Sequence, residues 1–258
     1  MTDVAPMRML LLLLMVLCAL IQPSKSWAEA NYIKPSWPDL LRTMVRMKAF
    51  DIKDPKLMQE YAFITECDLY KSFYNNDFKW HKVMNAIYEN VQRNTAEFPS
   101  SYHFDVRLQL GRYDFQTNLY KFTTKTSLGS INTIIFYEVA GPACGAVEIK
   151  YIPKSFRVVF DAPTNIPGIP MDAAKGEYWL RYLDSHDNPD HVVYAKFNFR
   201  IIYVEPLIPE LQSTGSDEVV YSQRTRTERR EIRMDGHLNS IDFYADEDMK
   251  TLIYEYIP

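Results

Sequence analysis

The sequence predicts an α+β fold, in which an N-terminal region of about three helices precedes a mainly antiparallel β-sheet or sandwich. Two observations carry this prediction. Between residues 36 and 95 the apolar side chains recur every three or four positions, which is the period of one face of a helix. From His103 onward they alternate every second position, as in strands with one buried face.

The helical region is expected to span residues 29–97. Asp54 followed by Pro55 is typical of a helix start, because an aspartate side chain caps the free amides and proline fits the first turn. Ser36 begins an earlier helix in the same way. The helix after Asp54 is expected to continue to Phe73, and Asp77 is expected to cap a third helix.

A β-rich region is expected over residues 98–205. The clearest alternating stretches occupy 103–110, 156–160 and 193–203. One helix, residues 172–183, is expected to interrupt the strands, with Asp172 as its cap.

The C-terminal part is expected to contain a linker and a short β-meander. Residues 206–217 hold prolines, a glycine and polar side chains, which favour a linker, and the meander is expected over 218–258. Within it, Asp235-Gly236 is the dipeptide of a two-residue hairpin, so one strand is expected to end near Met234.

The first 28 residues have the order of a secretory signal peptide. Arg8 precedes an unbroken apolar run over 9–21, and a polar stretch then ends at Ala28. The run is shorter than the roughly 20 residues that a membrane-spanning helix needs. Cleavage is expected after Ala28 or after Ala30, and an uncleaved anchor is the alternative. We therefore expect export, with the periplasm as the destination and secretion as a second possibility.

Composition and motifs narrow the class of protein. The formal net charge of −4 indicates no general attraction to nucleic acid. Beyond the signal segment no apolar stretch approaches membrane-spanning length, so no transmembrane segment is expected after signal removal. The glycines form no dinucleotide-binding or phosphate-binding loop, and the common hydrolase signatures are missing. The sequence therefore favours a protein without a cofactor and, on balance, without catalytic activity.

Two cysteines remain after signal removal, Cys67 and Cys144. In an oxidising compartment a pair of thiols is expected to form a disulfide, which would tie the helical region to the middle of the chain. Two separate buried thiols are the alternative.

The segment Asp184–His191 is the first candidate site. It contains two histidines and three aspartates in eight residues. His186, Asp187 and His191 are the residues expected to hold a metal ion, if the segment binds one. The alternative is a polar turn, for which Asp, Asn and Pro are the usual residues.

An arginine-rich segment is the second candidate site. It is expected to contact an anionic partner through Arg224, Arg226, Arg229, Arg230 and Arg233. The alternative is an exposed edge strand whose charges deter sheet pairing.

Together these observations predict an exported protein that binds or scaffolds a partner in the cell envelope. The expected partner is an envelope protein, a lipid or a glycan. A metal-assisted hydrolase that uses the 184–191 loop is one alternative, and a secreted effector is another. The sequence sets no oligomeric state.

Overall fold

The computed structural model describes residues 31–123, 128, 130–137, 144, 149–186, 188, 190–207 and 231–258. The predicted signal peptide, most of the predicted linker and the first part of the arginine-rich segment lie outside these residues. The helices and strands described below all belong to one compact unit, Tyr32–Pro258.

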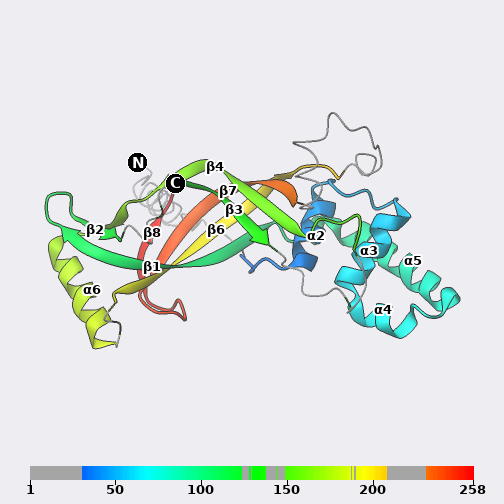
Figure 1. Ribbon diagram of the computed structural model, residues 1–258, viewed down its shortest axis with the longest axis horizontal. Helices are drawn as coiled ribbons and strands as arrows, with labels where there is room; N and C mark the ends of the chain where they lie inside the picture. Colours follow the sequence, from blue (N-terminus) through cyan, green and yellow to red (C-terminus); the bar gives the residue numbers. More distant parts are fainter. Residues whose placement is uncertain are drawn as a thin grey trace, which may run out of the picture. The chain divides into compact units, whose positions relative to one another are not determined.

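The described part of the chain begins with a group of helices (Figure 1). They are α2 (Trp37–Arg46), α3 (Pro55–Thr65), α4 (Cys67–Phe73), α5 (Asp77–Asn94) and the short 3₁₀ helix η1 (Thr95–Glu97). None of the described helices is long and apolar enough to cross a membrane.

The predicted helix starts are confirmed, with two corrections. The side chains of Ser36 and Asp54 accept hydrogen bonds from backbone amides in the first turns of α2 and α3. Helix α5 is capped by Asn76 rather than Asp77, since the Asn76 side chain accepts the amide of Lys79. The second predicted helix is two helices, because Glu66 has a non-helical backbone (φ −127°, ψ 48°). The helical spacing of apolar residues continues across Glu66, so the sequence pattern did not indicate this break.

Among the residues that the structure describes, eight strands form one sheet: β1 (Ser101–Asp114), β2 (Leu119–Phe122), β3 (Ser130–Tyr137), β4 (Ser155–Asn165), β5 (Gly168–Pro170), β6 (Val192–Val204), β7 (Glu231–Tyr244) and β8 (Leu252–Tyr256). Their order is β3-β4-β7-β6-β1-β2-β5, and β8 also pairs with β7. Every pairing is antiparallel except that of β4 with β7. The predicted α+β class, with helices first and a mostly antiparallel sheet after them, is confirmed.

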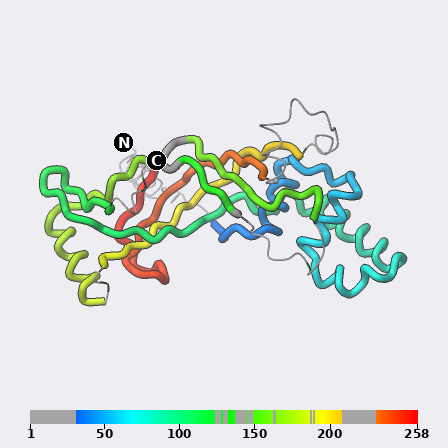
Figure 2. The backbone as a smooth tube through the Cα atoms, viewed as in Figure 1, coloured from blue at the N-terminus to red at the C-terminus, as the bar shows by residue number. Residues whose placement is uncertain are grey.

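The predicted inserted helix is α6 (Ala173–Ser185), which begins at the Asp172 cap. Figure 2 shows it beside the connection between β1 and β2. Gly176 permits this contact, because a Cβ atom there would lie 3.0 Å from the ring of Tyr113. The Tyr113 hydroxyl also donates a hydrogen bond to the carbonyl of Met171 (2.8 Å), which fixes the start of α6 against the sheet.

The sheet curls so that its own side chains fill one face. Phe122 on β2 stacks on Phe243 of β7 with ring centroids 5.7 Å apart, although β6 and β1 lie between these strands. Phe136 on β3 and Phe199 on β6 are 6.5 Å apart across β4 and β7. In a flat sheet, strands three places apart are separated by roughly 14 Å. Such contacts therefore require strong curvature around a shared aromatic core.

Polar contacts tie the helices to this core. Thr43 on α2 and Tyr102 on β1 are both fully buried and are hydrogen-bonded to each other. The Tyr102 hydroxyl also donates to the carbonyl of Asp39 (2.9 Å). Glu60 on α3 is buried, and its carboxylate accepts the backbone amides of residues 150, 151 and 152 at 2.5–2.8 Å. One continuous cluster of buried apolar side chains spans the helices and the sheet.

The predicted hairpin turn at Asp235-Gly236 is wrong. Strand β7 runs straight through both residues, and the chain turns only after Tyr244, before β8. Gly236 faces β4 instead, where an added Cβ would lie 2.9 Å from Cγ1 of Val158. The glycine leaves room for the side chains of Val158 and Phe160 on the neighbouring strand, and the backbone does not reverse direction there.

Candidate functional site

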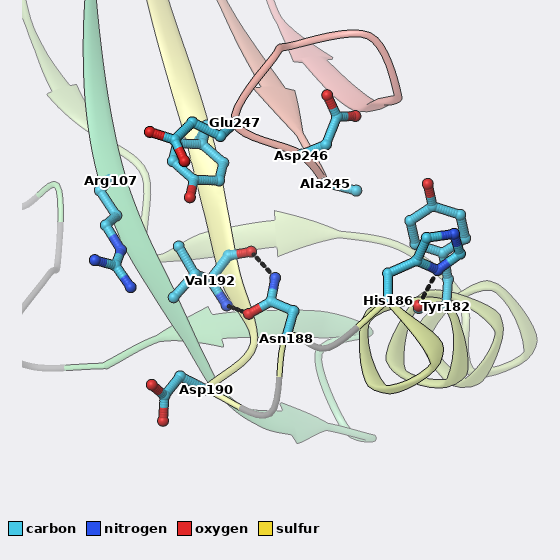
Figure 3. A pocket seen from close by; sticks show the side chains of 10 residues that line it. Arg107, Tyr182, His186, Asn188, Asp190, Val192, Ala245, Asp246 and Glu247 are labelled. Atoms are coloured by element: carbon cyan, nitrogen blue, oxygen red, sulfur yellow. Dashed lines mark hydrogen bonds between the residues drawn. The ribbon is translucent and has the colours of Figure 1, made fainter.

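The loop after α6, which the sequence singled out, lines a cleft of about 340 Å³ (Figure 3). The cleft lies where the end of α6 meets the outward side chains of β1 and β6 and the turn between β7 and β8. Its lining residues are Arg107, Tyr182, His186, Asn188, Asp190, Val192, Tyr194, Ala245, Asp246 and Glu247.

The loop wall of the cleft is fixed by Asn188. Its side-chain amide donates to the carbonyl of Val192 (2.7 Å) and accepts the amide of the same residue (2.9 Å). This pair of bonds imitates strand pairing and attaches the loop to the first residue of β6, as Figure 3 shows. The amide of Asn188 donates to the carbonyl of Leu183, which anchors the loop to α6 as well.

His186 and Tyr182 form an aromatic wall at the end of α6. Their rings stack with centroids 4.1 Å apart and an interplanar angle of 21°. Nδ1 of His186 lies 2.8 Å from the Tyr182 carbonyl oxygen. Because a carbonyl oxygen only accepts, Nδ1 carries the proton, and in the neutral ring Nε2 keeps its lone pair. The histidine therefore offers an acceptor atom at Nε2.

Asp246 forms the opposite wall, in the turn between β7 and β8. Desolvation raises the pKa of its carboxyl group, but hydrogen bonds from the amides of Lys250 (2.9 Å) and Thr251 (2.7 Å) lower it by more in sum. The net pKa lies below the usual value for aspartate, so this carboxylate is ionised at neutral pH. Its bonds also hold the turn in one conformation.

Three exposed charged side chains complete the lining: Arg107, Asp190 and Glu247. None of them forms an ion pair with another described residue. Arg107 lies on β1, across the cleft from His186 (Figure 3). With Asp246, the described lining residues include three carboxylates and one guanidinium, so this part of the cleft favours a cationic group.

The predicted metal ligands do not converge in the described part of the chain. Nε2 of His191 lies 2.9 Å from Oδ1 of Asp184, whereas His186 is bonded through Nδ1 to Tyr182. The described residues contain no group of three His, Cys, Asp or Glu side chains that could hold a metal ion. Asp187 lies outside those residues, so the metal site stays a prediction.

Of the predicted arginine surface, only Arg233 can be located. It lies on β7, and its Nε donates to Oδ1 of Asp235 at 2.8 Å. Arg224, Arg226, Arg229 and Arg230 are outside the described residues. Partner binding by this segment therefore also stays a prediction.

The two cysteines lie where the predicted crosslink requires. The Sγ atoms of Cys67 and Cys144 are 2.14 Å apart, at bonding distance, and their Cα atoms are 5.1 Å apart. The bond joins the first residue of α4 to a residue 77 positions further along the chain.

Sequence reasoning missed the other walls of the cleft. None of Arg107, Asp246 and Glu247 was singled out from the sequence. Only the pairing of β6 with both β1 and β7 brings these residues to the loop after α6. The alternation of apolar and polar residues in β1 indicated which face of the sheet Arg107 lies on. It did not indicate which residues from other elements lie beside it.

An α+β fold with a preformed polar cleft defines the chain only as a candidate binding protein. Comparison with known families assigns the chain more specifically than the fold and the cleft do. The model described as "Domain of unknown function (DUF4852)" matches residues 54–182, half of the chain, so the chain belongs to that family. The match begins at the Asp54 cap and ends at Tyr182 in α6. No curated protein and no solved structure matches the chain.

Proposed function

We propose that this protein is exported and works as a binding protein of the cell envelope, with the cleft beside α6 as its binding site. The ligand we propose is a small molecule or a partner side chain that carries an ammonium or guanidinium group. The observation that carries the proposal is the preformed cleft, in which, among the described lining residues, three carboxylates accompany one guanidinium.

Two features support export. The apolar run over 9–21 has the length and surroundings of a signal peptide. The sulfurs of Cys67 and Cys144 lie at bonding distance, and structural disulfides persist mainly in oxidising compartments.

The rigidity of the walls supports binding. Asn188, His186 and Asp246 are each held by hydrogen bonds within the protein, so a ligand meets groups that are already in position. Preorganisation lowers the entropy that association costs. The stacked rings of Tyr182 and His186 add an aromatic surface, and the faces of aromatic rings attract cations.

Titration of the purified protein with lysine methyl ester and with arginine amide, followed by amide NMR, tests the cleft. Both cations should shift resonances of residues 182–194 and 245–247, and sodium acetate should not. The double variant Asp190→Asn/Glu247→Gln should bind about tenfold more weakly, because each exposed charge contributes up to about 1 kcal/mol. Asp248→Asn is the matched control, since Asp248 lies in the same turn but does not line the cleft. Equal losses in both proteins would contradict the proposal.

Fractionation of an expressing cell tests export. We expect the protein outside the cytoplasm, with its N-terminus at Glu29 or Asn31 and no free thiol before reduction. Retention in the cytoplasm, with residues 1–28 present and both thiols reactive, would refute export without bearing on the cleft.

A metal-assisted hydrolase is the second candidate function, and one observation favours it. A histidine that donates Nδ1–H to a backbone carbonyl, as His186 does, has the arrangement common among metal-ligating histidines. Elemental analysis of the purified protein should then show a stoichiometric metal that is lost in the His186→Ala/His191→Ala variant. A metal-free protein that shows no thermal shift with added Zn²⁺ would exclude this candidate.

A further inference from the structure

The turn between α4 and α5 exposes large apolar side chains. We call residues Leu69–Lys82 the hairpin tip. Phe78 is 86% exposed, and Leu69 and Tyr74 are each 38% exposed. Figure 1 shows the α4–α5 connection at the end of the helical group that lies away from the sheet. Helix α4 has no buried residue at all, whereas α3 buries seven of its eleven residues.

The hairpin tip is nevertheless ordered by specific contacts. The rings of Tyr70, Tyr74 and Trp80 touch one another with centroids 4.5–5.8 Å apart. All three also contact Phe63 of α3, and the crosslink from Cys67 holds the start of α4. The exposed side chains therefore project from a fixed base.

The hairpin tip carries a positive charge in an acidic chain. It contains three lysines and one acidic residue, Asp77, whereas the whole chain has a formal net charge of −4. The lysines are Lys71, Lys79 and Lys82. Asp68 lies in the first turn of α4, at the crosslinked end. All three lysines are exposed, and none forms an ion pair with another described residue.

We infer that the hairpin tip binds an anionic phospholipid surface. Exposed aromatic side chains between lysines are typical of segments that lie in the headgroup region of a bilayer. The lysines meet the negative surface potential, and Phe78 and Tyr74 enter the boundary between headgroups and acyl chains. A projecting tip suits a soft surface of this kind, because a lipid layer deforms around it, whereas a rigid protein partner would need a matching groove. The inference is independent of the cleft beside α6.

Sedimentation with vesicles tests the inference. The protein isolated after export is mixed with vesicles of phosphatidylcholine alone or with about one-third phosphatidylglycerol, a composition that resembles an anionic leaflet. Binding is expected only to the anionic vesicles, and it should fall when NaCl is raised to about 0.5 M, because salt screens the lysines. If residues 9–21 are retained, all variants are compared in that same background, where the apolar run contributes equally.

Matched variants assign the effect to the hairpin tip. Phe78→Gln should lower partitioning about tenfold, whereas Phe115→Gln should leave it unchanged, since Phe115 is 78% exposed on the far β1–β2 connection. The triple variant Lys71→Gln/Lys79→Gln/Lys82→Gln should lower it about a hundredfold, at roughly fivefold per lysine. Lys34→Gln/Lys154→Gln/Lys175→Gln removes the same charge from other exposed positions and should have a much smaller effect.

Several outcomes would overturn the inference. The first is that the unmodified protein does not bind the anionic vesicles. The second is that Phe78→Gln and Phe115→Gln lower vesicle binding equally. The third is that the two triple lysine variants lower vesicle binding equally. A concentration-dependent dimer in sedimentation velocity that Phe78→Gln abolishes would assign the hairpin tip to a second copy of the chain instead. Circular dichroism of Phe78→Gln should match that of the unmodified protein, because the replaced ring is almost fully exposed.

Discussion

Helices α3 and α4 follow each other in the chain, yet different forces hold them in place. Helix α3 buries seven residues, and its Glu60 carboxylate accepts three backbone amides from the far side of the core. Helix α4 has seven residues, buries none and has no side-chain cap at Glu66. A helix this short is not stable alone in water. Its position depends on the ring contacts near Tyr70 and on the bond from Cys67 to Cys144.

The contrast shows that a helix such as α4 can follow a core helix in the chain and contact the core without burying residues in it. Helix α3 is stabilised by burial, and burial is lost only when the whole unit unfolds. Helix α4 is held by ring contacts and by a covalent crosslink, and the crosslink can be removed while the core remains. Each helix should therefore respond to a different kind of perturbation.

Removal of the crosslink should have the largest effect. For a closed loop of 77 residues, the chain-entropy model gives about 4.5 kcal/mol of stabilisation. The Cys67→Ser/Cys144→Ser variant should lose about that much unfolding free energy in a urea titration. In hydrogen exchange, the amides of α4 should lose protection before those of α3. An unfolding free energy equal to that of the oxidised protein would show that the crosslink does not stabilise the fold.

Truncation of a buried side chain in α3 should cause the second-largest loss of unfolding free energy. Leu57 is 2% exposed, and Leu57→Ala should cost about 3 kcal/mol because it removes buried methyl groups and leaves a cavity. Thermal and chemical unfolding measure this loss. A cost under about 1 kcal/mol would mean that α3 is not packed as described.

Neutralisation of Glu60 should cost less. Glu60→Gln keeps the size of the side chain but replaces one carboxylate oxygen with an amide nitrogen that cannot accept the backbone amides. We expect a loss of about 2 kcal/mol in unfolding free energy. Glu66→Gln is the control, since Glu66 makes no side-chain cap bond, and it should change stability by less than about 0.5 kcal/mol.

Leu69→Ala should have the smallest effect and completes the comparison with Leu57→Ala. Leu69 lies on α4 and is 38% exposed, so its truncation should change the unfolding free energy by no more than about 0.5 kcal/mol. Differential scanning calorimetry of the two leucine variants side by side would show the contrast. Similar losses for both would mean that α4 shares the core with α3.

Local signals in the sequence were sufficient for most elements. Ser36, Asp54 and Asp172 cap their helices as predicted, because capping depends only on residues within one turn. The dipeptide Asp235-Gly236 failed because a glycine needed for close strand packing looks the same in sequence as one needed for a turn. The helix break at Glu66 failed because the apolar spacing continued on both sides of it.

Long-range arrangement accounts for what was missed. The loop around His186 was visible as a polar cluster, but its partners are far away in the chain: Arg107 lies on β1 and Glu247 in the turn between β7 and β8. Their proximity depends on the pairing of β6 with β1 and β7, in which Tyr194 lies opposite Arg107 on one side and Tyr244 on the other. The sequence around Arg107 or Glu247 contains no pattern that indicates this strand pairing. Inspection of a short stretch of sequence therefore could not reveal the cleft.

The place of β7 has a consequence for when this chain can fold. Strand β7 (Glu231–Tyr244) follows β4 and β6 in the chain, yet in the sheet it lies between them, and it also pairs with β8. A nascent chain that lacks it cannot close the sheet, and pairing over such long sequence separations is slow. Closure of the sheet therefore waits until β7 has been synthesised. Under the export proposed above, this delay would leave the chain unfolded during translocation, which is the state that passage through a narrow secretion channel demands.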